Sequence, residues 1–248
     1  MADPLSSPRF LASGDAGLTV EFGDGIDEAT NRAVVALADA LDAAPPAGLR
    51  EVVPTYRSLL VMFDPLVLPR RRLMEIIAAL LRPAAGTAVA EPVPWRVPVR
   101  YGGEEGIDLR AIADLHGISE DEVIRLHSGA LYRVYMIGFA PGFSYLGGLP
   151  KALHTERRRD PRPKTPPRSV SIGGRQAAVA PPLSIPSGWH LLGRTPVRSY
   201  DPRRAGRPFL FAPGDRIAFV PIDGRDYRDM CAAAEAGEVV ATREHGHG

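Results

Sequence analysis

The chain contains one cysteine, Cys231, among 248 residues, which excludes an internal disulfide framework and any zinc site built on cysteine. No stretch approaches the roughly 20 consecutive apolar residues that span a bilayer, and residues 1–14 lack the basic and apolar segments of a secretion signal. The formal net charge of +1 gives no general attraction to nucleic acid or anionic lipid. We therefore expect a cytoplasmic protein that contacts neither membranes nor nucleic acid.

Familiar catalytic signatures are also missing. The sequence has neither a P-loop nor a dinucleotide-binding glycine fingerprint, and no serine or cysteine lies in a recognisable nucleophile elbow. Cys231 lies in an apolar helical stretch, which favours a small buried side chain over a nucleophile. The histidines offer no pair at zinc spacing except His245 and His247 in a polar tail, so we expect no metal site.

The first third of the chain has the pattern of a small α+β domain. Apolar alternation and helical periodicity predict, in order, a strand, a helix capped by Asp27, two strands and a second helix, at residues 18–22, 28–44, 51–53, 59–63 and 73–81. This order predicts two helices on one face of an antiparallel sheet, over about residues 8–90. Alanine, proline and glycine then mark residues 82–94 as a linker.

Beyond the linker, short apolar runs alternate with glycine and proline, which predicts a closed or strongly coiled β-structure. Two short helices interrupt it, at residues 108–116 and 119–128, and Ser119 with Glu122 forms a capping box. The pair resembles a DNA-binding helix-turn-helix, but acidic residues 120–122 occupy the end that would enter the major groove. We expect a packed helical insert.

Residues 138–150 follow a predicted strand and combine four glycines, two prolines and three aromatic residues. This composition permits close backbone approach beside apolar walls, although a structural loop at the end of a barrel would look the same. The residues predicted to contact a ligand here are Phe139, Pro141, Gly142, Phe143 and Tyr145.

A basic run from Arg157 to Arg168 comes next, broken by four prolines that keep it extended. Guanidinium groups held in this way suit a carboxylate or a phosphate, whereas the alternative is a solvated loop. We predict that Arg157, Arg158 and Arg162 bind an anion.

Residues 184–196 place Trp189, His190, Arg194 and Thr195 around two glycines. His190 is the candidate general base because imidazole titrates near neutrality, although most such histidines are simply hydrogen-bonded. We expect the segments 138–150 and 188–196 to meet at one end of the barrel and line one cavity, with the arginines at its rim. The pattern predicts a binding pocket but not a complete set of catalytic residues.

At these segments the chain resembles the family that contains the B-type component of 5-oxoprolinase, the Kip inhibitor of a sporulation kinase and allophanate hydrolase subunit 1. The matching residues run nearly from end to end; they include 14–16, 20–23, 51–61, 138–139, 141–143, 145–147, 149–150, 161–162, 173–174, Gln176 and 188–191. Gln176 joins the predicted substrate-binding residues on this ground.

The resemblance implies a ferredoxin-like α+β domain at residues 1–90 and a cyclophilin-like β-barrel at 91–248, with a helical insert and a C-terminal helix. It implies a non-autonomous component of an ATP-dependent 5-oxoprolinase complex, which cleaves 5-oxoproline to glutamate. The main partner of this chain would be the C-type component of 5-oxoprolinase, and the A-type component would be a further partner. ATP with Mg²⁺ would act at the level of the complex, with no cofactor tightly bound to this chain. Two alternatives stay open: an inhibitor of a sensor histidine kinase, and the carboxyltransferase half of a biotin-dependent urea carboxylase.

The chain departs from the family pattern at three positions. Arg168, Ala178 and Ser187 stand where glycine is usual. Because a side chain narrows the approach of ligand to backbone, these replacements leave the substrate open.

Overall fold

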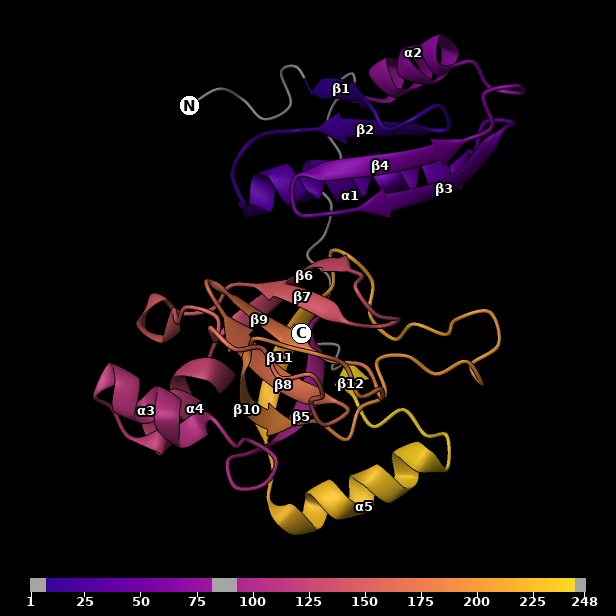
Figure 1. The fold of residues 1–248 in the computed structure, drawn as a ribbon. Coiled ribbons are helices and arrows are strands. Elements are labelled where there is room, and N and C mark those ends of the chain that lie inside the picture. The colour runs from indigo at the N-terminus through magenta and orange to yellow at the C-terminus, as the bar shows by residue number, and fades with distance from the viewer. Residues whose placement is uncertain (1–7, 82–92, 244–248) are drawn as a thin grey trace, which may run out of the picture. The chain divides into compact units, whose positions relative to one another are not determined.

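The computed structural model describes residues 8–81 and 93–243, and the chain divides into two compact units, Met1–Glu91 and Pro92–Gly248 (Figure 1). Most of the predicted linker lies outside the described residues, as do His245 and His247. None of the helices in the described part of the chain has the length and apolar character needed to span a bilayer.

The first unit is a four-stranded antiparallel sheet in the order β1-β2-β4-β3, packed against two helices. Its elements are β1 (Arg9–Ala12), β2 (Gly17–Glu21), α1 (Glu28–Ala43), β3 (Leu49–Pro54), β4 (Ser58–Phe63) and α2 (Arg70–Leu80). Strand β4 pairs between β2 and β3, which gives the split βαβ arrangement of ferredoxin-like folds. Asp27 caps α1 as predicted, because its carboxylate accepts a hydrogen bond from the Thr30 amide at 2.9 Å.

Strand β1 was not predicted. It pairs with β2 along one edge of the sheet, where most of its residues are exposed, so its sequence lacks a buried apolar face. Edge strands of this kind carry little of the alternation by which strands are recognised.

The second unit is a closed seven-stranded barrel in the order β10-β8-β9-β7-β6-β11-β5, and β5 pairs back onto β10 at Arg100–Arg194 and Tyr101–Gly193 (Figure 1). Its strands are β5 (Trp95–Tyr101), β6 (Leu131–Ile137), β7 (Ser144–Gly147), β8 (Ser169–Gly173), β9 (Gln176–Val179), β10 (His190–Arg194), β11 (Arg216–Pro221) and a short β12 (Thr242–Arg243) beside β5. The predicted α+β domain followed by a mainly-β, cyclophilin-like barrel is confirmed.

The helical insert consists of α3 (Leu109–His116) and α4 (Glu120–Ser128), as predicted. Gly117 ends α3 in the left-handed conformation, at φ 66°. The Ser119 hydroxyl caps α4 by accepting from the Glu122 amide, whereas the Glu122 carboxylate binds Arg125 at 2.6 Å. Val123 packs into the barrel core, so the insert is a packed element of the barrel.

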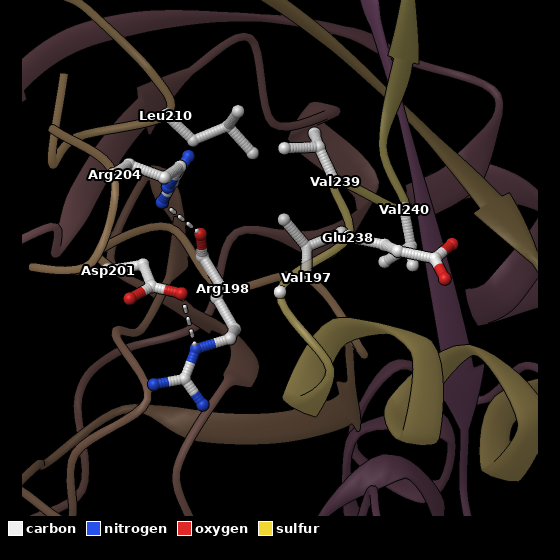
Figure 2. Close-up of a pocket in the computed structure, with 9 residues that line it drawn as sticks. Val197, Arg198, Asp201, Arg204, Leu210, Glu238, Val239 and Val240 are labelled. Atoms are coloured by element: carbon white, nitrogen blue, oxygen red, sulfur yellow. Dashed lines mark hydrogen bonds and ion pairs between the residues drawn. The ribbon is translucent and has the colours of Figure 1, made fainter.

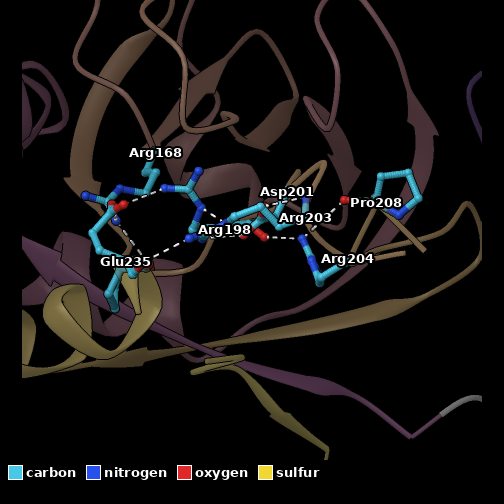
Figure 3. A network of polar contacts seen from close by, with 8 residues as sticks. Arg168, Arg198, Asp201, Arg203, Arg204, Pro208 and Glu235 are labelled. Atoms are coloured by element: carbon cyan, nitrogen blue, oxygen red, sulfur yellow. Dashed lines mark hydrogen bonds and ion pairs between the residues drawn. The ribbon is translucent and has the colours of Figure 1, made fainter. Parts of the chain in front are cut away.

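The C-terminal helix α5 (Gly224–Glu235) is tied to the barrel by arginines that share two carboxylates (Figure 3). The Glu235 carboxylate accepts from Arg168 at 3.3 Å and Arg198 at 2.8 Å. Arg203 donates to the Asp201 carboxylate at 2.7 Å, and this hydrogen bond lowers the pKa of Asp201 although burial acts in the opposite direction.

A small cavity lies beside this network (Figure 2); it is lined by Val197, Arg198, Asp201, Arg204, Leu210, Gly237, Glu238, Val239 and Val240. Its volume of about 10 Å³ suits a single water molecule and no substrate. Cys231, on α5, is half-buried, so the expectation of a buried side chain was wrong. Helix α5 lies along the outside of the barrel (Figure 1).

His127, near the end of α4, is completely buried in an aromatic cluster. Its Nδ1 lies 2.8 Å from the Tyr101 hydroxyl, and its ring stacks on Phe219 with centroids 4.7 Å apart. Burial lowers the pKa of His127 to about 3, because a charged imidazole would lose its hydration there. The ring is therefore neutral across the physiological range.

We predict that the free energy of unfolding falls as the pH drops below about 6.5, the ordinary pKa of an unfolded histidine. The unfolded chain takes up a proton there, whereas folded His127 stays neutral down to about pH 3. The loss should approach about 1.4 kcal/mol per pH unit. Urea denaturation of wild type and His127→Gln between pH 7.5 and 4 measures it, and equal pH dependence of the two proteins would contradict it.

Candidate functional site

A cavity of about 290 Å³ lies on the outer face of the barrel, and we call it the aromatic cavity. It is lined by Phe139, Phe143, Tyr145, Arg157, Arg158, Pro161, Pro186, Ser187, Gly188 and Trp189. Three segments far apart in sequence form it: the β6–β7 turn with β7, the basic loop before β8, and the loop before β10. The predicted shared cavity of the segments 138–150 and 188–196 is thus confirmed for the beginning of the second segment. Its predicted place at one end of the barrel was wrong, because Tyr145 and Ala178 alternate with Leu146 and Ala177, whose side chains belong to the barrel core.

Aromatic side chains in contact with one another build the wall of this cavity. The ring centroid of Phe143 lies 4.7 Å from that of Tyr145 and 6.2 Å from that of Trp189. The Tyr145 and Trp189 rings are 6.0 Å apart and steeply inclined. Such edge-on contacts are favourable between aromatic quadrupoles, so each ring fixes the orientation of the next.

Small residues on the neighbouring strands make room for the indole of Trp189. A Cβ added to Gly173, at the end of β8, would lie 2.8 Å from the Trp189 ring. Ala178 on β9 is fully buried in the same apolar cluster as Phe143 and Trp189. A larger residue at either position would displace the indole from the cavity wall.

Phe139 projects from the β6–β7 turn and is 65% exposed. Its backbone is left-handed, at φ 69°, which is rare for a bulky residue and costs of order 1–3 kcal/mol. The turn is held by hydrogen bonds from the Gly138 amide to Phe143 O and from the Phe143 amide to Ala140 O. Strain that keeps an aromatic side chain exposed at the mouth of a cavity is typical of a binding surface.

Arg157 supplies a positive charge to the aromatic cavity. Its guanidinium carbon lies 5.3 Å from the centroid of the Trp189 ring, within the range of a cation–π contact. Burial raises the pKa of the Tyr145 hydroxyl, and the charge of Arg157 acts in the opposite direction. Aromatic faces and a guanidinium therefore meet in one small volume.

The basic loop is pinned in place by backbone and carboxylate contacts. Arg158 donates its amide hydrogen to Gly188 O at 2.7 Å, and Arg162 exchanges two backbone hydrogen bonds with Ser187, at 2.8 and 2.9 Å. The Arg162 guanidinium donates two hydrogen bonds, at 2.6 and 3.0 Å, to the buried carboxylate of Asp108. Asp108 also accepts from the Leu191 amide at 2.7 Å.

This ion pair corrects the expected position of Arg162. Its guanidinium is directed at Asp108 and not at the rim of the aromatic cavity, because a buried carboxylate needs a charged partner. Of the three predicted arginines, Arg157 and Arg158 line the cavity. Sequence reasoning missed Asp108, which lies 54 residues from its partner and has no local signature.

A family model described as the carboxyltransferase domain, subdomain C and D, matches residues 8–211. The chain belongs to this family. It is also 36% identical over 229 residues to the B-type component of 5-oxoprolinase from Bacillus subtilis, a match that covers 86% of this chain and 92% of the relative.

Two solved structures extend the comparison. TTHA0988 has a TM-score of 0.75 and 41% sequence identity, and the match covers 84% of this chain and 40% of that one. This chain thus spans about two fifths of that protein's length. The urea carboxylase of Kluyveromyces lactis has a TM-score of 0.76 at 18% identity, over 96% of this chain and 24% of that one, and shows a likeness of fold alone.

Two residues predicted from the composition of the segment 184–196 do not line the aromatic cavity. Arg194 and Thr195 stand at the far end of β10, where the Arg194 Nε donates to Pro167 O and the Thr195 hydroxyl accepts from the Val197 amide. Residues 190–194 form a strand and not a loop, which carries the chain away from the cavity.

The remaining predicted residues do not line the aromatic cavity. Gln176 begins β9 after the tight turn at Gly174, and Pro141 is exposed beside Phe139. Gly142 is buried at φ 82°, where an added Cβ would lie 2.7 Å from Tyr200 Cβ. His190 lines a neighbouring groove, and its Nε2 donates to Glu156 O at 2.9 Å. The roles of these residues in binding or catalysis stay predictions.

The three replaced glycines have different structural settings. Arg168 keeps the left-handed backbone, at φ 62°, and its guanidinium donates to Pro196 O and Glu235. Ala178 is buried in the same apolar cluster as Phe143 and Trp189, and Ser187 lines the cavity. One of the three departures from the family pattern thus lines the cavity, and a second packs in the cluster that forms its wall.

We predict that Arg162→Ala lowers the free energy of unfolding by about 2 to 3 kcal/mol, because it leaves the carboxylate of Asp108 without its bidentate partner. Arg162→Lys should recover only part of this loss, since an ammonium cannot pair in the same way. Urea denaturation measures the change, with exposed Arg159→Ala as the matched control. Equal stabilities of the two alanine variants would refute the structural role of Arg162.

Gly173→Ala should displace the indole of Trp189 and change its fluorescence, because the new methyl group would lie 2.8 Å from that ring. Gly174→Asn is the matched control, since Gly174 has open space around it and asparagine tolerates its left-handed backbone. The emission maximum and its quenching by acrylamide report the change. An unaltered spectrum in Gly173→Ala would show that the indole does not depend on this glycine.

Proposed function

We propose that this chain is the B-type component of an ATP-dependent 5-oxoprolinase, a complex that opens the lactam ring of 5-oxoproline to give glutamate. The observation that carries the proposal is the 36% identity to the B-type component of the Bacillus subtilis 5-oxoprolinase across 86% of the chain. The aromatic cavity supports it, because residues of the matching segments 141–143, 145–147 and 188–191 line it together.

The aromatic cavity suits a small, flat, anionic ring. Phe143, Tyr145 and Trp189 offer apolar faces that would pack against the ring of a lactam. Arg157 would hold its carboxylate, since its guanidinium is already oriented by the contact with Trp189. These residues would bind and orient the substrate.

The chemical step is assigned to the assembled complex. His190, the candidate general base, lines the groove next to the aromatic cavity, and no nucleophile elbow or P-loop is present in the sequence. We assign ATP and Mg²⁺ to the complex with the C-type component, the main partner, and the A-type component. The role of this chain would be to complete a site that the partners share.

The decisive experiment is reconstitution from purified components. We expect glutamate to form from 5-oxoproline, with ATP consumed, when this chain is combined with the A-type and C-type components, and no glutamate to form from this chain alone. Turnover by the isolated chain would contradict the proposal. Carboxylation of urea when the chain is combined with a biotin carboxylase, or inhibition of a sensor kinase without oxoprolinase activity, would replace it by one of the alternatives.

Arg157→Ala should raise the KM of the reconstituted complex for 5-oxoproline about tenfold, which corresponds to about 1.4 kcal/mol for one charge-assisted contact. Arg159→Ala is the matched control, because Arg159 is an exposed arginine of the same loop and does not line the cavity. Steady-state kinetics of both variants tests this, after gel filtration has shown intact complexes. Equal KM values would remove Arg157 from the substrate site.

A further inference from the structure

A second hollow adjoins the aromatic cavity, and we call it the imidazole groove. It has a volume of about 470 Å³ and is lined by Leu115, His116, His154, Thr155, Glu156, Arg157 and His190. Its three histidines come from the end of α3, from the segment after the 3-10 turn η1 (Lys151–Leu153), and from the start of β10. Arg157 lines both hollows, so it lies on their border.

Each of the three imidazoles is anchored through the same ring nitrogen. The Nε2 of His154 donates to Leu149 O at 3.1 Å, and that of His190 donates to Glu156 O at 2.9 Å. The Nε2 of His116 lies 2.8 Å from the Thr155 hydroxyl, which donates its own hydrogen to Leu153 O. The oxygen of Thr155 is therefore an acceptor toward His116, and all three rings carry hydrogen on Nε2.

This common tautomer determines what the groove offers to a ligand. With Nε2 committed to the protein, Nδ1 is the nitrogen that remains for an incoming group. A neutral ring presents a lone pair there, and a protonated ring presents a hydrogen-bond donor. By taking up protons, the three imidazoles would turn the groove into an array of donors.

The charges around the groove favour an anion. When the rings are protonated, His116, His154, His190 and Arg157 face the single carboxylate of Glu156, which is exposed. Arg158 lines the aromatic cavity, and its guanidinium lies 3.8 Å from the carboxylate of Asp108, which also forms an ion pair with Arg162. Within the described residues no group of three or more His, Cys, Asp or Glu side chains is arranged to hold a metal ion.

We infer that the imidazole groove binds a phosphoryl group, with uptake of protons by its histidines, next to a ring held in the aromatic cavity. The Nδ1 hydrogens and the guanidinium of Arg157 donate to the phosphoryl oxygens, and Arg157 joins the two subsites. The inference deepens the proposed function and rests on it only for the identity of the ring. The phosphoryl group belongs either to a nucleotide or to a phosphorylated substrate.

The test uses sulfate as a probe, because sulfate remains a dianion between pH 6 and 8 and any pH dependence then reports the protein. Calorimetric titration of the full chain should show sulfate binding about tenfold more tightly at pH 6 than at pH 8, because binding is coupled to proton uptake by the rings. Histidine NMR should show the pKa of His116, His154 and His190 rising with sulfate. His127 is the internal control, because it is buried outside the groove.

His154→Gln and His190→Gln should each weaken sulfate binding at pH 6 at least fivefold and reduce its pH dependence, with Arg159→Ala as a charge control that leaves both unchanged. Affinity that is independent of pH, or equal in wild type and both histidine variants, overturns the inference. Inorganic phosphate, pyrophosphate and ATP then separate the sources: tighter binding of ATP indicates a nucleotide, and equal binding of phosphate and ATP indicates a phosphorylated substrate. Because the isolated chain is used, failed reconstitution with intact sulfate binding would refute the proposed function and leave the groove standing.

Discussion

The candidate site depends on one buried group, the carboxylate of Asp108. It lies buried just before the helical insert, accepts two hydrogen bonds from Arg162 of the basic loop, and accepts a third from the Leu191 amide of β10. A carboxylate removed from water requires such partners, and here each belongs to a different segment. One side chain thus holds the basic loop against the barrel, and the walls of both hollows follow from its position.

The two hollows differ in how they are built. The aromatic cavity is an apolar structure: its rings orient one another, and Gly173 leaves space for Trp189. The imidazole groove is a polar structure in which protein acceptors fix the hydrogen on each ring. Arg157 lies on their border, where its charge is available to a ligand in either one. A site that divides in this way suits a substrate with a small ring and an anionic group.

The elements with buried, periodic faces could be predicted from the sequence. Helices α1 to α4 and strands β2 to β6, β8 and β11 are marked by apolar residues at regular spacing or by capping residues. Strands β1, β7, β9, β10 and β12 could not be found in this way, because they are short, rich in glycine or at an edge. The pairing of β10 depends in addition on barrel closure, which joins residues nearly a hundred positions apart, such as Tyr101 and Gly193.

By itself, the sequence determined the fold class, the family, and the aromatic and basic character of the site, because these follow from local composition and from motifs read along the chain. Only the tertiary structure decided which arginine remains available to a ligand and that three histidines share a groove. The reason is physical: the availability of a charged group depends on what lies opposite to it in space. The neighbour opposite Arg162 is the carboxylate of Asp108, 54 residues away, whereas the neighbour opposite Arg157 is the ring face of Trp189.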